Sequence, residues 1–223
     1  MDQTMLNQIV GQVVATLSKL AVKDELEKGI PVGISNRHIH LSADDCEKLF
    51  GWDHGLTRKK DLKQTGEFAA METVTLVGRK GIIQGVRVLG PLRQSTQIEI
   101  SRTDGFSLGI NPPVRDSGDI AQSAGIVVVG PCGAITLQEG VICASRHIHM
   151  NSDEAHRFGV CDGDRAMVEV DGPRGCTLKN VLVRVHPSFR LEFHIDTDEA
   201  NAVGLKNGDQ VRLPQCEEIE HGQ

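Results

Sequence analysis

Aromatic side chains are scarce in this sequence. The 223 residues include six phenylalanines, one tryptophan and no tyrosine, although hydrophobic residues make up 39% of the chain. The core must therefore be aliphatic and filled by valine, isoleucine and leucine. Twenty-four glycines imply many tight turns, and hence many short elements of secondary structure.

Other absences restrict the classes of function. A net charge of −6 argues against a broad nucleic-acid-binding surface, so an anionic ligand would need a local cluster of Arg and Lys. No secretory signal and no bilayer-spanning apolar run is present, so we expect no membrane partner. The six cysteines form no C-x-x-C pair, which predicts free thiols in a reducing cytosol.

One four-residue motif occurs twice. Arg37-His38-Ile39-His40 lies near the N-terminus, and Arg146-His147-Ile148-His149 lies in the second half of the chain. Both copies follow a serine and lead into the start of a helix. The match indicates an internal duplication with a pair of histidines in each half.

The duplication extends beyond the histidines. Val86-Arg87-Val88 matches Val183-Arg184-Val185, and a Gly-x-x-x-Gly-Asp turn occurs at 159–164 and at 204–209. Each half also contains short strand patterns separated by glycine turns, predicted at 72–77, 82–89 and 97–100 and at 166–170, 183–185 and 191–195. We predict a mainly β protein of two similar small closed β-barrels with short capping helices, including one at 43–50.

The periodicity also predicts the domain boundaries. Residues 1–28 contain an amphipathic N-terminal helix, which could pack on its own domain or dock its apolar face on a partner. We expect the first barrel at 37–140, the second at 141–214, a linker near 137–140 and a tail at 215–223. Residues 54–68 read as polar and irregular.

Each pair of histidines is a candidate half of a metal site. In a strand, His-x-His places both imidazoles on one face, and neutral imidazole is a common zinc ligand. Aligning the repeats proposes a third ligand in each half, Glu99 in the first and His194 in the second. The predicted sets are His38, His40 and Glu99, and His147, His149 and His194. The alternatives are an ion pair of Glu99 with a neighbour such as Arg102, and a core His194 hydrogen-bonded to Asp196 or Glu192.

Basic residues near these sets are candidates for binding an anion. Arg93 precedes Glu99 by six residues in a turn rich in hydrogen-bonding groups, which suits bidentate recognition of a phosphate or carboxylate. Arg58, Lys59, Lys60 and Lys63 form a basic cluster. That cluster is either a solvated face or a phosphate clamp.

Long motifs in this chain resemble those of the PduL-type phosphate acyltransferases, the phosphate propanoyltransferases. The resemblance covers residues 30–213, and the segments that carry it are 34–42, 89–93, 98–104, 145–150 and 194–201. It implies a reversible transfer in which acyl-CoA and phosphate give acyl phosphate and CoA. It also implies two zinc ions held by the two predicted sets, with the active site between two barrels.

The resemblance further implies residue roles. The strand at 30–36 would complete the second barrel, and phosphate would bind to Arg93. Contacts to CoA carry over onto Ser35, Lys60, Arg87, Leu89, His194 and Asn201. Residues 2–20 resemble the helix that directs such enzymes into bacterial microcompartments. We therefore expect a bacterial cytoplasmic enzyme in a microcompartment lumen, with a shell or cargo protein as partner and with homo-oligomerisation left open.

The chemistry expected is direct attack of phosphate on the thioester, without an acyl-enzyme, because no cysteine recurs near both sets of ligands. Zinc would act as a Lewis acid and as a ligand of the thiolate. Two other functions remain open: a zinc-stabilised binding module without catalysis, and a zinc thioester hydrolase. Acetyl and propanoyl groups are not distinguished.

Overall fold

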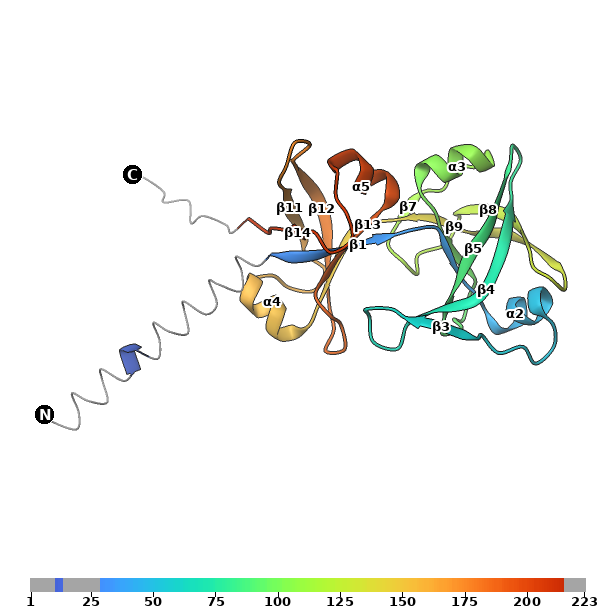
Figure 1. Ribbon diagram of the computed structural model, residues 1–223, viewed down its shortest axis with the longest axis horizontal. Coiled ribbons are helices and arrows are strands. Elements are labelled where there is room, and N and C mark those ends of the chain that lie inside the picture. Colours follow the sequence, from blue (N-terminus) through green and yellow to red (C-terminus); the bar gives the residue numbers. More distant parts are fainter. Residues whose placement is uncertain (1–10, 14–28, 215–223) are drawn as a thin grey trace, which may run out of the picture.

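Two β-sheets, each rolled into a barrel, make up the chain (Figure 1). This computed structural model describes residues 11–13 and 29–214. The two barrels and the short helices on them confirm the predicted fold class. Residues 11–13 are helical, whereas the rest of the predicted N-terminal helix at 2–28 and the tail at 215–223 lie outside the described residues. Within the described part, no helix is long and apolar enough to cross a membrane.

The first barrel closes because one strand, β8, bridges two strands near opposite ends of the sheet. β8 is antiparallel to β4 on one side and to β9 on the other. The helices α2 (Ala43–Phe50) and α3 (Arg102–Leu108) pack on this barrel. Its strands are β2 (His38–His40), β3 (Arg58–Asp61), β4 (Phe68–Val77), β5 (Ile82–Gly90), β6 (Gln97–Glu99), β7 (Val114–Arg115), β8 (Ala124–Val129) and β9 (Ala134–Ala144).

The second barrel is a six-stranded sheet in the order β11-β12-β10-β13-β1-β14. It closes through two backbone hydrogen bonds, of 2.8 and 3.1 Å, between Glu169 of β11 and Arg212, the residue after β14. The helices are α4 (Ser152–Phe158) and α5 (Thr197–Val203). The strands are β1 (Ile30–Ser35), β10 (His147–Met150), β11 (Arg165–Val170), β12 (Cys176–Val185), β13 (Glu192–Asp196) and β14 (Gln210–Val211).

Each barrel has its own apolar core. Ile39, Leu76 and Ile98 are fully buried in the first core, and Ile148, Val183 and Phe193 are fully buried in the second. Phe193 is the one aromatic residue among the largest fully buried side chains in the described part of the chain. The cores are thus aliphatic, as the composition required.

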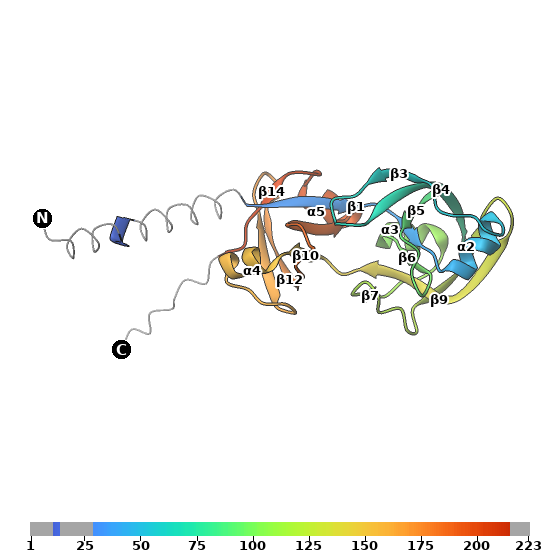
Figure 2. The ribbon, with the colours of Figure 1, turned by 90° about the horizontal axis from the view of Figure 1, so that it is seen from below.

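The chain passes between the barrels twice. β1 belongs to the second barrel, where it is parallel to β13 and antiparallel to β14, yet it leads directly into β2 of the first barrel. The chain returns where β9 leads into β10. Both views show β1 extending from one barrel toward the other (Figures 1 and 2). The two pairs of histidines therefore begin where the chain enters each barrel.

Two local expectations are wrong. Residues 137–140, predicted as a linker, lie inside the long strand β9. The stretch at 54–68, expected to be irregular, contains β3, whose Arg-Lys-Lys-Asp side chains are all exposed. A charged edge strand of this kind shows no alternation of apolar residues, because both of its faces meet solvent.

Candidate active site

The first predicted set of ligands comes together on two neighbouring strands. β2 is antiparallel to β6, and the Cα atom of His38 lies opposite that of Glu99. His40 projects from the same face as His38, because side chains alternate along a strand. Ligand atoms of His38, His40 and Glu99 all lie within 4.8 Å of one another. We call this group the carboxylate triad.

The second set repeats that arrangement. β10 is antiparallel to β13, and His147 lies opposite His194. Ligand atoms of His147, His149 and His194 also lie within 4.8 Å of one another, and the rings of His147 and His194 stack with centroids 5.0 Å apart. We call this group the histidine triad.

The first histidine of each pair has its tautomer fixed in the same way. Nδ1 of His38 lies 2.8 Å from the backbone oxygen of Asn36, and Nδ1 of His147 lies 2.8 Å from that of Ser145. A carbonyl oxygen can only accept, so Nδ1 must carry the proton. The Nε2 lone pair of each ring is then available to a cation, an arrangement typical of metal-binding histidines.

Burial keeps three imidazoles neutral. Loss of hydration, reinforced by the neighbouring His38, lowers the pKa of His40 to about 3. Burial and the nearby His194 lower the pKa of His147 to about 4, and burial with His147 lowers that of His149 to about 2. Neutral imidazoles are the ligand form that a metal requires.

Several ligand atoms have no hydrogen-bond partner within the described part of the chain. They include Nδ1 of His40 and both ring nitrogens of His149, all of which are buried. A buried polar atom without a partner is costly, so such atoms call for a ligand. Two clusters of imidazole nitrogens, one of them with a carboxylate, fit a cation such as zinc, which binds imidazole and carboxylate ligands.

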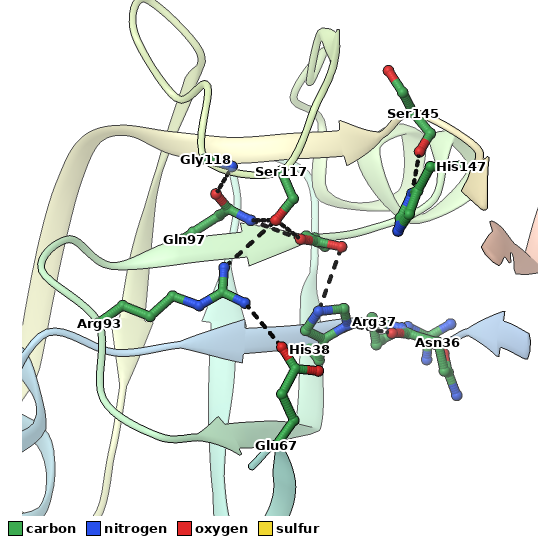
Figure 3. A network of polar contacts seen from close by, with 11 residues as sticks. Asn36, Arg37, His38, Glu67, Arg93, Gln97, Ser117, Gly118, Ser145 and His147 are labelled. Atoms are coloured by element: carbon green, nitrogen blue, oxygen red, sulfur yellow. Dashed lines mark hydrogen bonds and ion pairs between the residues drawn. The ribbon is translucent and has the colours of Figure 1, made fainter. Parts of the chain in front are cut away.

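The third member of each triad is supported by the residue two positions earlier. Nε2 of Gln97 donates to Oε1 of Glu99 at 2.6 Å, and the Ser117 hydroxyl donates to the same oxygen at 2.9 Å (Figure 3). In the second half, Oε2 of Glu192 lies 2.8 Å from Nε2 of His194. The support is therefore a pair of donors for the carboxylate and an acceptor for the imidazole.

These contacts also set the charges of the two carboxylates. Burial alone would raise the pKa of Glu99, but His38, His40 and the Ser117 hydroxyl outweigh it and hold that pKa below its usual value. Burial likewise opposes ionisation of Glu192, and the contact with His194 outweighs it, so the pKa of Glu192 is also lowered. Both groups are carboxylates at neutral pH.

The alternative partners considered for the third ligands have different outcomes. Arg102 donates to Asn111 at 2.9 Å, and Glu99 makes its contacts inside the site instead. Asp196 caps α5 by accepting from the backbone of Glu199 at 2.8 Å. Glu192 does contact His194, as one alternative proposed. That contact leaves His194 within the histidine triad.

Both triads open into one cavity of about 770 Å³ lined by residues of the two barrels. Its charged lining comprises six cations and four carboxylates, although the whole chain is acidic. The cations are Arg37, Lys60, Lys63, Arg87, Arg93 and Arg184, and the carboxylates are Asp61, Glu67, Glu99 and Glu192. Such a cavity favours an anionic ligand.

Most of the predicted ligand-contact residues line this cavity. They are Ser35, Lys60, Arg87, Leu89, Arg93 and His194. Asn201 lies on the exposed side of α5, and the cavity is lined instead by Asn207, which accepts a hydrogen bond from the backbone of Ile34 at 2.7 Å. A role for Asn201 in binding stays a prediction.

Arg93 lies next to the carboxylate triad. Its guanidinium lies 3.5 Å from the Ser117 hydroxyl and 3.7 Å from a carboxylate oxygen of Glu67, as Figure 3 shows. Both contacts are long, so much of its hydrogen-bonding capacity is unused. Burial lowers the pKa of Arg93, which nevertheless stays charged at neutral pH.

The repeated arginines have a supporting role that the sequence did not reveal. Arg37 makes a two-pronged ion pair with Asp104 of α3, at 2.9 and 2.8 Å, and Arg146 lies 3.3 Å from Glu199 of α5. Each arginine thus ties the start of a histidine strand to a helix. This role could have been predicted from the sequence, because an arginine directly precedes both histidine pairs.

Four other residues around the site were missed by the sequence interpretation. Gln97, Ser117 and Glu67 surround Glu99 and Arg93, and Gln64 exchanges hydrogen bonds of 3.0 and 3.1 Å with the backbone of Arg190 across the two barrels. Gln97 could have been found, because it occupies the place in the repeat that Glu192 occupies in the second half. The others come from loops without a counterpart.

Comparison with known proteins gives one consistent match. A family model described as phosphate propanoyltransferase matches residues 31–206. A phosphate propanoyltransferase of Thermotoga maritima is 56% identical over 84% of this chain and 90% of its own length. Those of Rhodobacter capsulatus and Salmonella typhimurium are 51% and 48% identical, over 95% and 93% of this chain and 97% and 95% of theirs.

Proposed function

The chain belongs to the phosphate propanoyltransferase family and is an acyltransferase, and from that premise we propose that it exchanges a short acyl group, propanoyl or acetyl, between CoA and inorganic phosphate at a dinuclear zinc site. The observation that carries this proposal is the pair of triads facing one cation-rich cavity. Two metal-binding triads, one on each barrel, could bind the thioester and the phosphate separately.

The six triad residues would hold the metals. His38, His40 and Glu99 would bind one ion, and His147, His149 and His194 the other. Bound zinc would supply Lewis acidity toward the thioester and stabilisation of a thiolate. The protein fixes the ligands in advance through the carbonyls of Asn36 and Ser145 and through Gln97 and Ser117.

The basic residues would hold the two substrates. Ser35, Lys60, Arg87 and Leu89 lie along the part of the cavity formed by β1, β3 and β5, where we place CoA. Arg93 would bind phosphate as the catalytic arginine, because a guanidinium matches a phosphate oxygen pair and keeps its charge. Holding phosphate beside the thioester supplies a large part of the rate through proximity.

The reaction that we propose is a direct transfer. A phosphate oxygen forms a bond to the acyl carbonyl carbon, the carbon–sulfur bond breaks, and CoA leaves as a thiolate. None of the five described cysteines lines the cavity, and burial raises the pKa of Cys143 to about 11. The described cysteines are therefore unsuited to forming an acyl-enzyme.

The assay follows CoA release from propanoyl-CoA with and without phosphate. Phosphate-dependent release with acyl phosphate as product supports the transferase. Equal release without phosphate supports a thioester hydrolase. A mass shift on quenched enzyme would contradict direct transfer.

Chelation separates catalytic from structural zinc. We expect a chelator to abolish transfer while circular dichroism and the elution volume stay unchanged, and added zinc to restore activity. Unfolding on chelation, with no activity before it, would instead support a binding module stabilised by metal. Metal analysis should find two equivalents of zinc per chain before chelation and after zinc is added back.

We also propose that residues 2–20 direct the enzyme into a bacterial microcompartment. This segment lies outside the described residues apart from 11–13, so the support is its amphipathic sequence pattern. Deleting residues 1–25 should abolish co-purification with shells and spare catalysis. Continued co-purification of the truncated chain would contradict the proposal.

A further inference from the structure

Arg184 lies beside the histidine triad. It belongs to β12, which is parallel to β10, and its Cα atom lies opposite that of His149 in the histidine triad. The side chain is half-buried and lines the cavity. A charged residue in register with a triad histidine is well placed to meet a ligand of the site.

Arg184 is not the structural counterpart of Arg87, although the matching Val-Arg-Val segments suggest that it is. Arg87 lies opposite His38, the first histidine of its pair, whereas Arg184 lies opposite the second histidine, His149. In the second barrel, the place opposite the first histidine is taken by Leu182. The two registers therefore differ by two residues, and Arg184 occupies a position that has no arginine in the first barrel.

Arg184 also differs from Arg87 in its partners. Arg87 donates to the backbone oxygens of Ala70 and Met71 at 3.0 and 2.8 Å, which uses its capacity structurally. Among the described residues, the side chain of Arg184 makes no hydrogen bond or ion pair; its guanidinium carbon lies 5.8 Å from the centroid of the Phe189 ring. The Phe189 ring also packs on His149, with ring centroids 4.3 Å apart, so it lies against both Arg184 and a histidine of the triad.

Two other cations of the cavity are already matched by carboxylates. Arg37 is paired with Asp104 at 2.8 Å, and Lys63 lies 3.3 Å from Glu192. Lys60 has no such partner in the part of the chain that the structure describes, but it is exposed on the edge strand β3. The half-buried charge of Arg184 is the one that most needs an anion.

Arg184 and Arg93 share one electrostatic environment across the cavity. The charge of Arg184 adds to burial in lowering the pKa of Arg93, and it acts in the same direction on His147 and His149. Two like charges facing one cavity repel each other unless an anion lies between them. A doubly charged oxyanion offers enough oxygen atoms for two guanidinium groups.

We propose that Arg184 is a second phosphate-binding residue, which with Arg93 clamps the phosphoryl group of phosphate and of acyl phosphate from opposite barrels. This inference rests on the proposed phosphate acyltransferase function. It assigns to the second barrel a direct contact with the attacking nucleophile. The clamp favours a dianionic oxyanion over a carboxylate, which has too few oxygens for both arginines.

The test compares Arg184→Gln, Arg184→Lys and a matched control, Arg174→Gln, which removes an exposed arginine of the same barrel outside the cavity. Arg184→Gln should raise the KM for phosphate about tenfold or more while changing the KM for propanoyl-CoA less than about twofold. Arg184→Lys should recover only part of the loss, because it keeps the charge but not the planar fork. Arg174→Gln should match the wild type.

Two results would overturn the inference. One is an unchanged KM for phosphate, and the other is a rise confined to propanoyl-CoA, which would assign Arg184 to the phosphates of CoA. Circular dichroism of each variant checks folding, and if Arg184→Gln fails to fold, Arg184→Lys carries the comparison.

Calorimetry with inorganic phosphate alone measures the same clamp without turnover. Weaker binding to Arg184→Gln than to Arg174→Gln supports it, and equal binding contradicts it. Wild-type protein that shows no phosphate-dependent CoA release would refute the proposed function instead, and the calorimetric result would still decide on the clamp.

Discussion

In the first barrel the third member of the triad is a carboxylate, Glu99, whereas in the second it is an imidazole, His194. The strands around them are arranged alike, with the third residue directly opposite the first histidine of each pair. The supporting residues differ to match, since Gln97 donates to the carboxylate and Glu192 accepts near the imidazole. One duplicated frame thus builds two sites of different formal charge.

This difference suggests a division of labour. A cation bound by two imidazoles and one carboxylate keeps less net positive charge than one bound by three imidazoles. The histidine triad should therefore hold the more electrophilic ion, while the carboxylate triad lies beside Arg93, which restores positive charge locally.

Removing a ligand from either half should have the largest effect. His38→Ala and His147→Ala should each lose one equivalent of metal and lower kcat/KM by about 10²–10³-fold or more, since each removes electrostatic stabilisation at the reacting groups. Metal analysis and steady-state kinetics measure both effects. His156→Ala, on the exposed face of α4, is the control. Full activity with one metal equivalent would show that only one half is catalytic.

The supporting residues should have a smaller effect that differs between halves. Gln97→Leu should weaken metal binding by the carboxylate triad about 10- to 100-fold, because it removes a donor to Glu99. Glu192→Gln should act on the histidine triad and leave the other metal unchanged. Competition with a chelator, read separately for each equivalent of metal, tests this. Equal loss from both sites in either variant would contradict independent support.

Acidification should distinguish the two halves of the metal-free protein. A folded-state pKa below the unfolded value means that the unfolded chain binds more protons, so stability is lost as pH falls below about 6.5. The loss continues toward the folded pKa values of about 4 for His147 and 2 for His149, whereas His40, at about 3, is the one histidine of the carboxylate triad whose pKa is lowered. Each such histidine lowers the free energy of unfolding by up to about 1.4 kcal/mol for each unit by which the pH falls.

Hydrogen exchange of the chelated protein between pH 8 and pH 5 measures this difference. Peptides covering β10 and β13 should lose protection before those covering β2 and β6. At pH 8 the two groups of peptides should be protected alike. Earlier loss in the first barrel would show that its other interactions, rather than the number of buried histidines, limit stability.

The repeated arginines should give the smallest effect. Arg37→Gln breaks a two-pronged pair with a buried carboxylate and should cost about 1–2 kcal/mol of unfolding free energy. Arg146→Gln breaks a single longer contact and should cost less than about 1 kcal/mol. Urea denaturation measures both. Equal costs would mean that the geometry of the pairs does not decide their contribution.

The triads were predictable from the sequence because a strand repeats its side-chain direction every two residues. The His-x-His spacing and the duplication together brought out all six ligand candidates. The pairing partner of a strand is not contained in such a pattern, so the two-residue difference in register between Arg87 and Arg184 required the structure.

Element boundaries failed for related reasons. Gln138-Glu139-Gly140 resembles a linker because its residues are polar and end in glycine, and Gly140 does adopt a positive φ of 124°. Yet β9 continues through it, because residues on the outer face of a barrel strand can be polar. The placement of β1 in the second barrel came only from the family resemblance, since nothing local in Ile30–Ser35 encodes a distant partner.

The interlocked path of β1 has a consequence for synthesis of the protein. The second barrel needs residues from Ile30 to Val211, because β1 pairs with both β13 and β14. During synthesis on the ribosome, β1 remains unpaired until the whole first barrel and then β13 and β14 have been made. Half of the cavity wall can therefore form only when the chain is nearly complete, so a prematurely ended chain would carry the carboxylate triad without its opposite, and no short fragment would display a finished site.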